Sequence, residues 1–354
     1  MTTCLITGGA GFIGTALSHR LPDHFDRVVA YDNLHPQIHP SPERPADLDD
    51  RVEFVRGDVT SASEWDALLA DVAPDVIVHL AAETGTGQSL LEATRHASVN
   101  VVGTTEMLDA LVRAEQLPRK IVLTSSRAVY GEGAWVDAEG QVSYPGQRSA
   151  AMLERGEWDF PGLSALPFVS SEVTPSPTSV YGATKLAQEH ILRSWCLSLG
   201  VTDVIFRLQN VYGPGQSLIN PYTGIVSFFS QEAKAGRVIP VYEDGQIIRD
   251  FVYIDDVADA LVRGVLDSGS TPHPYDIGSG EGTSILRLAE LIAAHHGAPA
   301  PQINGKFRNG DVRHASCEVD ASRDALAWEP KVMVAEGVRL LCDWIDDQRA
   351  STLK

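Results

Sequence analysis

The sequence predicts an α/β fold, a doubly wound parallel sheet with a smaller mixed α/β lobe towards the C-terminus. From the N-terminus, apolar strand-like segments alternate with helix-like segments, which is the pattern of successive βαβ units. The first of these strands, at residues 5–7, leads directly into glycines spaced three apart. Beyond residue 211 the segments become short and mixed. We therefore expect domains at 1–211 and 212–354, with some segments of the second returning to the first.

The three glycines predict a binding site for a dinucleotide in a Rossmann-type domain. Gly8 permits the sharp turn from strand to helix, Gly11 lets the backbone approach a pyrophosphate, and Gly14 lets the helix pack closely on the strand. Phe12 and Ile13 begin the helix, whose unpaired amides and positive dipole end face the phosphates. Glycine clusters also make plain turns, so the prediction depends on the flanking strand and helix.

An acidic residue ends the second strand, at residues 27–32. Asp32 lies 18 residues after Gly14, where a carboxylate accepts hydrogen bonds from an adenosine ribose and repels a 2′-phosphate. NAD is therefore favoured over NADP. The alternative, a turn-forming aspartate before Asn33, is common, but here the position agrees with the glycine motif.

Later strands supply further cofactor candidates at their carboxyl ends. The strand at 52–59 ends in Asp58 and Val59, where an adenine would lie, and the strand at 75–82 ends in small residues that let the backbone touch a cofactor. His79 has apolar neighbours, so we interpret it as a packed strand residue. The remaining expected elements are helices at 94–116, 180–199 and 334–345, strands at 120–126 and 203–207, and an irregular insertion at 132–172.

Composition excludes several classes of partner. The 354 residues carry 47 acidic and 28 basic side chains, a formal charge of −19, which disfavours nucleic acid and anionic membranes. Apolar runs are far shorter than a membrane helix needs. No signal peptide is apparent, and the four cysteines lack paired spacing, so we expect reduced thiols in a cytoplasmic protein. The insertion contains no Cys or His, and no metal site is expected.

Three residues could carry out acid–base chemistry. Ser126 closes a strand, and Tyr181 and Lys185 lie one turn apart on one helix face. A phenol is a poor base at neutral pH, and a neighbouring ammonium, with a positive nicotinamide ring, lowers its pKa. Lys185 can also hold the nicotinamide ribose, while Ser126 donates to the substrate oxygen. A chance surface pair is the alternative, which the glycine motif and Asp32 disfavour.

Over nearly its whole length the chain resembles the extended short-chain dehydrogenase/reductase superfamily, in particular its nucleotide-sugar epimerases and dehydratases. The matching signatures lie at residues 7–14, 79–82, 100, 103–104, 125–126, 129–131, 181–185, 207–214, 249–257 and 308–311. Residues 125–133 and 210–218 look most like the epimerases that act on dTDP-L-rhamnose. The resemblance implies a nucleotide-diphosphate sugar as substrate and NAD as cofactor.

The resemblance also implies roles for individual residues. Cofactor contacts are implied for Gly8, Gly11, Phe12, Ile13, Asp32, Asn33, Asp58, Val59, Leu80, Ala81, Ala82, Asn100, Thr124, Tyr181 and Lys185. Substrate contacts are implied for Thr84, Ser126, Arg127, Asn210, Tyr222, Arg249, Arg308 and Asp311. Two arginines can neutralise a pyrophosphate bidentately, whereas Tyr222 or Phe228 would stack on the base. Alternatively, Arg249 pairs with Asp250 and Arg308 is a solvated loop residue.

One departure from the family pattern narrows the choice of reaction that the chain could catalyse. In the dehydratases, an Asp-Glu pair that moves protons follows the position of Ser126, whereas this chain has Arg127 and Ala128. Dehydration and decarboxylation are therefore disfavoured. The prediction is an NAD-dependent epimerase that inverts C4 of a dTDP- or UDP-hexose through a transient 4-keto sugar. The alternatives are a nucleotide-sugar dehydrogenase or 4-ketoreductase, a 4,6-dehydratase, and a non-catalytic NAD-binding regulator.

The resemblance further implies a homodimer. In this homodimer, the two long helices expected at 94–116 and 180–199 of one chain would pack against the same helices of a second copy as a four-helix bundle. A helix with two apolar faces can equally be buried inside the monomer.

Overall fold

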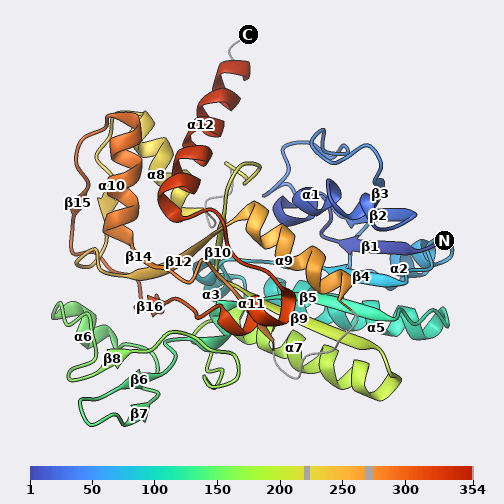
Figure 1. The fold of residues 1–354 in the computed structure, drawn as a ribbon, viewed down its shortest axis with the longest axis horizontal. Coiled ribbons are helices and arrows are strands. Elements are labelled where there is room, and N and C mark those ends of the chain that lie inside the picture. The colour runs from blue at the N-terminus through green and yellow to red at the C-terminus, as the bar shows by residue number, and fades with distance from the viewer. Residues whose placement is uncertain (219–223, 268–273, 353–354) are drawn as a thin grey trace. The chain divides into compact units, whose positions relative to one another are not determined.

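The computed structural model describes residues 1–218, 224–267 and 274–352, and side chains up to residue 348. The chain forms two compact units, each made of several segments. The first unit comprises residues 1–129, 179–207 and 258–275, and the second comprises 130–178, 208–257 and 276–354. The segment expected as an insertion therefore groups with the second unit. Figure 1 labels the elements.

The first unit is built on a seven-stranded sheet with strand order β13-β9-β5-β4-β1-β2-β3. The registers of β1 with β2 and β4, of β2 with β3 and of β4 with β5 are all parallel. This confirms the predicted doubly wound sheet. Its strands are β1 (Thr3–Thr7), β2 (Arg27–Asp32), β3 (Glu53–Arg56), β4 (Val76–His79), β5 (Lys120–Ser126), β9 (Thr202–Leu208) and β13 (Tyr275–Ile277), where the chain passes to the second unit.

Helices cover the sheet of the first unit. They are α1 (Phe12–Ser18), α2 (Ala62–Leu69), α3 (Thr86–Leu91), α4 (Ala93–Ala97), α5 (Gly103–Arg113), α7 (Val180–Leu199) and α9 (Ile254–Leu266), of which residues 254–257 belong to the second unit. One apolar core joins the sheet to α2, α5 and α7, through Trp65, Leu108 and Leu192. These side chains are buried, and burial of apolar area at about 25 cal/mol per Å² is the main stabilising term.

The second unit contains a four-stranded mixed sheet and a cluster of three helices. In the sheet, β12 pairs with β10 and β16 in parallel and with β14 in the antiparallel sense. Helices α8, α10 and α12 pack against one another. Its elements are β6 (Trp135–Val136), β7 (Val142–Ser143), α6 (Ala150–Glu154), β8 (Ser164–Ala165), β10 (Asn210–Tyr212), α8 (Ile225–Lys234), β11 (Pro240–Val241), β12 (Ile248–Tyr253), β14 (Gly282–Ser284), α10 (Ile285–His296), β15 (Gln302–Ile303), β16 (His314–Ala315), α11 (Asp320–Leu326) and α12 (Val334–Thr352).

The helix expected at 94–116 is interrupted. A π-helical turn at Ser98–Val102 separates α4 from α5. The reason lies in Asn100 at the centre of this turn, whose side chain bonds to the backbone of Glu83. The wider turn therefore directs a polar side chain into the interior, as π-bulges at functional sites often do.

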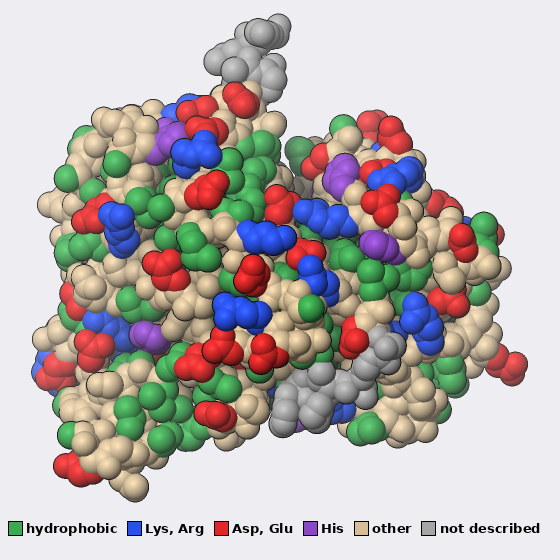
Figure 2. Space-filling model, in the orientation of Figure 1, with side chains coloured by type: hydrophobic (Ala, Val, Ile, Leu, Met, Phe, Trp, Pro, Cys, Tyr) green, Lys and Arg blue, Asp and Glu red, His purple; other side chains and the backbone are tan. Residues whose placement is uncertain are grey.

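None of the described helices is both long enough and apolar enough to cross a membrane. On the face drawn in Figure 2, acidic and basic side chains are interspersed and form no large field of one sign.

Candidate active site

The glycine turn between β1 and α1 has the backbone geometry expected of a phosphate-binding loop. Gly8 adopts a φ of +65°, which L side chains rarely reach, and a Cβ there would lie 2.7 Å from the Ala81 nitrogen. A Cβ at Gly11 would come within 3.2 Å of the Gly8 carbonyl oxygen, and one at Gly14 within 2.5 Å of the Gly9 oxygen. A side chain at any of these three glycines would therefore meet backbone atoms. Such a closely packed glycine turn fits the pyrophosphate of a dinucleotide.

The carboxylate expected to meet the adenosine ribose is held in place by the backbone. Asp32 ends β2 and accepts hydrogen bonds from the amides of Ala10, at 3.1 Å, and Leu34, at 2.8 Å. The glycine turn and the acid expected to bind the ribose are thus linked directly. This link also orients Asp32 at the carboxyl end of the sheet, where ligands of doubly wound folds bind.

The next two candidates, Asn33 and Asp58, bind each other. The Asn33 amide donates to Asp58 at 2.9 Å, and Thr60 donates to the other Asp58 oxygen through its amide, at 2.9 Å, and its hydroxyl, at 2.7 Å. Burial alone would raise the pKa of Asp58, but these hydrogen bonds outweigh it and lower the pKa. Asp58 is therefore an ionised, oriented acceptor beside β3.

His79 is a packed strand residue, as the sequence indicates. Its two ring nitrogens lie 2.7 Å from the Thr7 hydroxyl and 3.0 Å from the Thr104 hydroxyl, deep in the core. Burial lowers its pKa to about 3, so the ring stays neutral. These bonds tie β4 to β1 and to α5. Beyond β4, the Leu80 amide donates to the Thr7 carbonyl oxygen and the Ala81 amide donates to the Thr7 hydroxyl.

The structure brings Ser126, Tyr181 and Lys185 together at one end of the first unit's sheet. Ser126 is the last residue of β5, and its hydroxyl hydrogen-bonds to the phenol of Tyr181. Tyr181 and Lys185 lie one turn apart at the start of α7, which Ser179 caps by accepting from the Gly182 amide at 3.0 Å. The cap fixes where the helix begins, and therefore where the phenol points.

The electrostatics of this group differ from the sequence-based expectation. Burial raises the pKa of Tyr181, and the Ser126 hydrogen bond and the positive charge of Arg127 offset only part of that rise. Burial also lowers the pKa of Lys185 to about 7, against the opposing effect of Glu189. The predicted lowering of the tyrosine pKa by Lys185 is thus wrong for the protein alone, because desolvation dominates for both groups.

A buried network that sequence reasoning missed supports the three residues. Glu189 lies one turn beyond Lys185, accepts from the Ser125 hydroxyl, and forms a bidentate pair with Arg207, at 3.1 and 2.7 Å. Because Ser125 precedes Ser126 on β5, the network joins the strand that carries the serine to the helix that carries the tyrosine. The spacing Tyr181, Lys185, Glu189, each four apart on one face, was the available signal.

Asn100 and Thr124 are also placed near this end of the sheet. The Asn100 side chain bonds to the backbone amide and carbonyl of Glu83, at 2.8 and 3.0 Å, and donates to the Thr184 hydroxyl at 2.9 Å. It therefore connects the loop after β4, which includes Thr84, to α7 next to Lys185. Thr124 is buried in β5, with its hydroxyl 3.5 Å from the His79 carbonyl oxygen.

The second unit contains the residues expected to hold a diphosphate. Asn210 opens β10 and pairs in register with Phe251 of β12, the strand that also carries Arg249. Arg249 is buried, which lowers its pKa, while the carboxylates of Asp311 and Glu132 oppose that shift. Asp250 instead accepts from Ser279 and Gly280, so the alternative of an Arg249–Asp250 pair is not realised.

Arg308 lies on an exposed loop, its guanidinium 5.2 Å from the centre of the Tyr242 ring. Such a cation–π contact limits where the guanidinium can go. The amide of Asp311 donates to the Arg308 carbonyl at 3.3 Å, which closes the loop 308–311. Tyr222 lies outside the described residues, and Phe228 is a largely exposed residue of α8.

A charge network within the second unit anchors this loop and was not foreseen. Arg148, from the segment expected as an insertion, pairs with Glu243 at 2.8 and 2.9 Å and donates to the Asp311 carbonyl at 2.8 Å. Arg313 also pairs with Glu243, at 3.2 Å. Both side chains of the Arg148–Glu243 pair are only 1% exposed. The segment 130–178 therefore supports the loop that carries Arg308 and Asp311.

Comparison with known proteins identifies the family of this chain. A model of the NAD dependent epimerase/dehydratase family matches residues 4–150 and 161–278. The chain belongs to this family. Membership confirms the predicted superfamily and the predicted dependence on NAD.

Among relatives of this family, a dTDP-L-rhamnose 4-epimerase of Burkholderia thailandensis is 58% identical over 96% of this chain and 94% of that protein. A UDP-glucose 4-epimerase of Mycolicibacterium smegmatis is 33% identical, with coverage of 94% and 95%. The crystal structure of the Thermotoga maritima UDP-glucose 4-epimerase with UDP-glucose matches with a TM-score of 0.81 at 25% identity, over 98% of this chain and 100% of that one. The Thermus thermophilus UDP-glucose 4-epimerase, solved with NAD, matches with a TM-score of 0.77 at 26% identity, over 98% and 99%.

Proposed function

We propose that this protein is an NAD-dependent epimerase that inverts C4 of a nucleotide-activated 6-deoxyhexose, with dTDP-L-rhamnose as the first candidate. The observation that carries the proposal is the convergence of Ser126, Tyr181 and Lys185 at the carboxyl end of a dinucleotide-binding sheet. The 58% identity to a dTDP-L-rhamnose 4-epimerase over almost the whole of both chains supports the choice of sugar.

Each residue of the group has a separate role in this proposal. Bound NAD supplies a hydride acceptor and donor. Tyr181 removes the proton of the sugar 4-hydroxyl and later returns one to the 4-keto oxygen. Ser126, which bonds to the phenol, donates to the same sugar oxygen and fixes its position. Lys185 holds the nicotinamide ribose and, as an ammonium, stabilises the phenolate.

Cofactor retention is assigned to the glycine turn and the strand ends. Gly8, Gly11, Phe12 and Ile13 would receive the pyrophosphate, Asp32 the ribose hydroxyls, and Asn33, Asp58 and Val59 the adenine side. Leu80, Ala81, Ala82 and Thr124 would border the nicotinamide half. Asn100 acts through the Glu83 backbone and Thr184, and so positions the loop and Lys185.

Substrate contacts are assigned to the residues that the family resemblance implies. In the second unit Asn210, Arg249, Arg308 and Asp311 would hold the nucleotide diphosphate, because paired guanidinium groups bind phosphates bidentately. Thr84 and Arg127 would contact the sugar side, and Tyr222 the base.

Dehydration is the rival reaction within the family, and the residues after Ser126 argue against it. Loss of water needs a base that takes a proton from carbon and an acid that gives a proton to the departing hydroxyl, so that it leaves as water. The positions that follow Ser126 hold Arg127 and Ala128, of which alanine transfers no proton and arginine stays protonated. A net dehydrogenase or 4-ketoreductase would use the same residues, and only cofactor consumption separates it from an epimerase.

We further propose a homodimer in the cytoplasm. Apolar side chains lie exposed on the two helical segments expected at the dimer interface, with Val112 of α5 at 50% and Leu197 of α7 at 77%. A second copy of the chain is the partner that would cover both. The four cysteines are unpaired and buried, which is compatible with a reducing compartment.

The direct test is a binding and turnover screen of UDP-, dTDP- and GDP-sugars with the purified protein. We expect dTDP-L-rhamnose to be converted, without added NAD(H), to a product whose NMR couplings show the opposite configuration at C4. Turnover that consumes NAD(H) stoichiometrically would establish the reductase instead. Binding of a nucleotide sugar without any product would establish a non-catalytic protein.

A further inference from the structure

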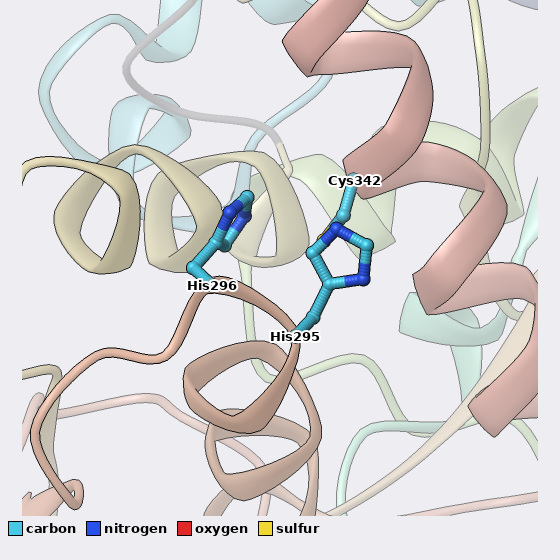
Figure 3. A group of neighbouring side chains, drawn as sticks. All are labelled: His295, His296 and Cys342. Carbon is cyan, nitrogen blue, oxygen red and sulfur yellow. The ribbon is translucent and has the colours of Figure 1, made fainter.

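The helical cluster of the second unit contains a group of potential metal ligands that the proposed reaction does not use. His295 and His296 are the last two residues of α10, and Cys342 lies in the middle of α12. One ligand atom of each, a ring nitrogen or the sulfur, lies within 4.8 Å of the other two. Figure 3 shows the His295 ring directed toward Cys342, with His296 beside it.

The environment of these side chains is unusual for simple packing. Among the side chains that the structure describes, the Nε2 atom of His296 is buried and has no hydrogen-bond partner. A buried polar atom without a hydrogen-bond partner destabilises the fold, because its lost contacts with water are not replaced. The Cys342 sulfur has one polar neighbour at 3.4 Å, the Ser230 hydroxyl of α8. The two imidazole rings stand almost perpendicular, at 81°, with centroids 4.7 Å apart.

A second layer of polar groups surrounds the three. Nε2 of His295 lies 3.6 Å from a carboxylate oxygen of Asp343. Ligating histidines commonly donate their other ring N–H to a carboxylate, which fixes the ring and strengthens the ligand. Asp346, one turn after Cys342 on α12, pairs with Lys234 of α8. Lys234 balances the charge of Asp346, so Asp343 is the carboxylate that adds negative charge beside the group, which favours a divalent cation.

We propose that His295, His296 and Cys342 form a zinc site that fastens α12 to α10. Two imidazoles and one thiolate are the ligand types that Zn²⁺ prefers, at about 2.0–2.1 Å for nitrogen and 2.3 Å for sulfur. A tetrahedral site separates its ligand atoms by roughly 3.3–3.7 Å, so side-chain rotations of about 1 Å from the present positions complete it. Water fills the fourth position.

The site would be structural. All three residues lie in the second unit, in helices that already pack against each other, and none belongs to the residues assigned to NAD or the sugar. The thiol of Cys342 loses its proton on binding, and the ion links the end of α10 to the long final helix. Zinc binding is therefore independent of the proposed epimerase activity, and each can be tested without the other.

Metal content is the first test. Protein stripped with a chelator, incubated with excess Zn²⁺ and passed through a desalting column should retain about one zinc per chain by mass spectrometry. The double variant H296A/C342A should retain none above background. The matched controls H24A and C196A, which remove an exposed histidine and a cysteine of the other unit, should retain the same zinc as the wild type. Equal zinc in the wild type and the double variant overturns the proposal.

The spectrum of bound Co²⁺ tests which side chains ligate the metal. Co²⁺ bound to the wild type should give intense visible bands of tetrahedral coordination and a thiolate-to-metal charge-transfer band in the near ultraviolet. Both should persist in C196A, and the charge-transfer band should vanish in C342A. A weak octahedral spectrum without that band in the wild type contradicts the proposal even if zinc is retained.

The affinity for zinc tests the role of Asp343, the carboxylate beside His295. Competition against a chromophoric chelator should show that D343N weakens zinc binding by roughly 10–100-fold, the usual cost of losing a carboxylate behind a ligating histidine. D347N, on the same helix, should leave the affinity unchanged. Zinc should also raise the Tm of the wild type and not that of H296A/C342A. If D343N and D347N behave alike, the proposed role of Asp343 is wrong.

Discussion

Burial controls the chemistry of the single residue on which the proposed reaction depends. Tyr181 is a partly buried residue whose phenol pKa is raised by desolvation, with Ser126 and Arg127 working in the opposite direction. Lys185 is buried as well, with a pKa lowered to about 7. Near neutral pH the ammonium of Lys185 therefore gains and loses its proton readily, whereas the phenol of Tyr181 stays protonated in the protein alone. A cationic nicotinamide ring would favour the phenolate. The diphosphate of a substrate is expected to influence the phenol only from a longer distance.

The first prediction concerns Tyr181. Substitution Y181F removes the proton-transferring hydroxyl but keeps the ring, so kcat should fall about 10²–10⁴-fold, the usual contribution of a general base. Bound NAD, measured by absorbance after denaturation, should stay at the wild-type level. A near-normal kcat for Y181F would show that another group moves the proton.

The second prediction concerns pH and His79. Its pKa is lowered from 6.5 to about 3 by burial, so between these values the unfolded chain binds one more proton than the folded one. This residue's share of the folding stability should therefore decrease as pH falls from 6.5 towards 3, by about 1.4 kcal/mol per pH unit. Urea denaturation across that range gives the free energy of unfolding as a function of pH. The slope of that dependence for H79N should be smaller than that of the wild type by the contribution of one bound proton. Parallel slopes for the two proteins would contradict the neutral, buried state of His79.

At the level of elements, α7 explains why so much of the site can be predicted from sequence. Tyr181 and Lys185 are four apart on a regular helix, and the glycine turn is local to β1 and α1, so their spacing in the chain fixes their spacing in space. Glu189 belongs to the same face and was within reach of that reasoning. Its partner Arg207 was not, because pairing between α7 and β9 depends on the sheet order.

Other features depend on contacts between distant segments. The π-helical turn at Ser98–Val102 forms because Asn100 satisfies the backbone of Glu83, which no periodicity in the helix reveals. Likewise the segment 130–178 has only short strands and a short helix of its own. Two of its charged residues, Arg148 and Asp159, find partners 95 and 154 residues away, in Glu243 and Arg313. Apolar periodicity predicts elements, whereas these partners follow only from the assembled fold.

The third prediction concerns the network in that segment. R148M leaves Glu243 and Glu132 buried without this guanidinium, and breaking such a pair typically costs about 3–5 kcal/mol. The urea midpoint should fall, and KM for the nucleotide sugar should rise while NAD content is kept, because Arg148 also holds the Asp311 carbonyl. R155M, which removes an exposed pair with Glu157, should match the wild type in both measurements. If R148M also matched it, the network would have no supporting role.

At the level of the whole molecule, 47 acidic and 28 basic residues give a formal charge of −19. Anionic ligands must therefore be attracted by positive side chains at the site itself. We expect Arg249 and Arg308 to provide that local charge within the second unit. Substrate binding should then be sensitive to loss of either arginine, since no general positive field replaces it.

The fourth prediction concerns assembly. Leu197 of α7 is 77% exposed in the single chain. L197E should convert a homodimer to a monomer in light scattering coupled to size-exclusion chromatography, because a carboxylate in an apolar interface is left unpaired. V142E, at an exposed valine of the second unit, should remain dimeric. A wild type that is monomeric at micromolar concentration would contradict the proposed interface.

The most direct test of the proposed epimerase reaction follows the hydrogen atom on C4 of the sugar. dTDP-L-rhamnose that carries deuterium at C4 should be incubated with the protein in ordinary water without added NAD(H), and the product examined by NMR. The account predicts an inverted C4 that keeps its deuterium, because the hydride leaves and returns within one bound complex. Product with hydrogen from water at C4, or no product until NAD(H) is supplied in stoichiometric amount, would contradict it.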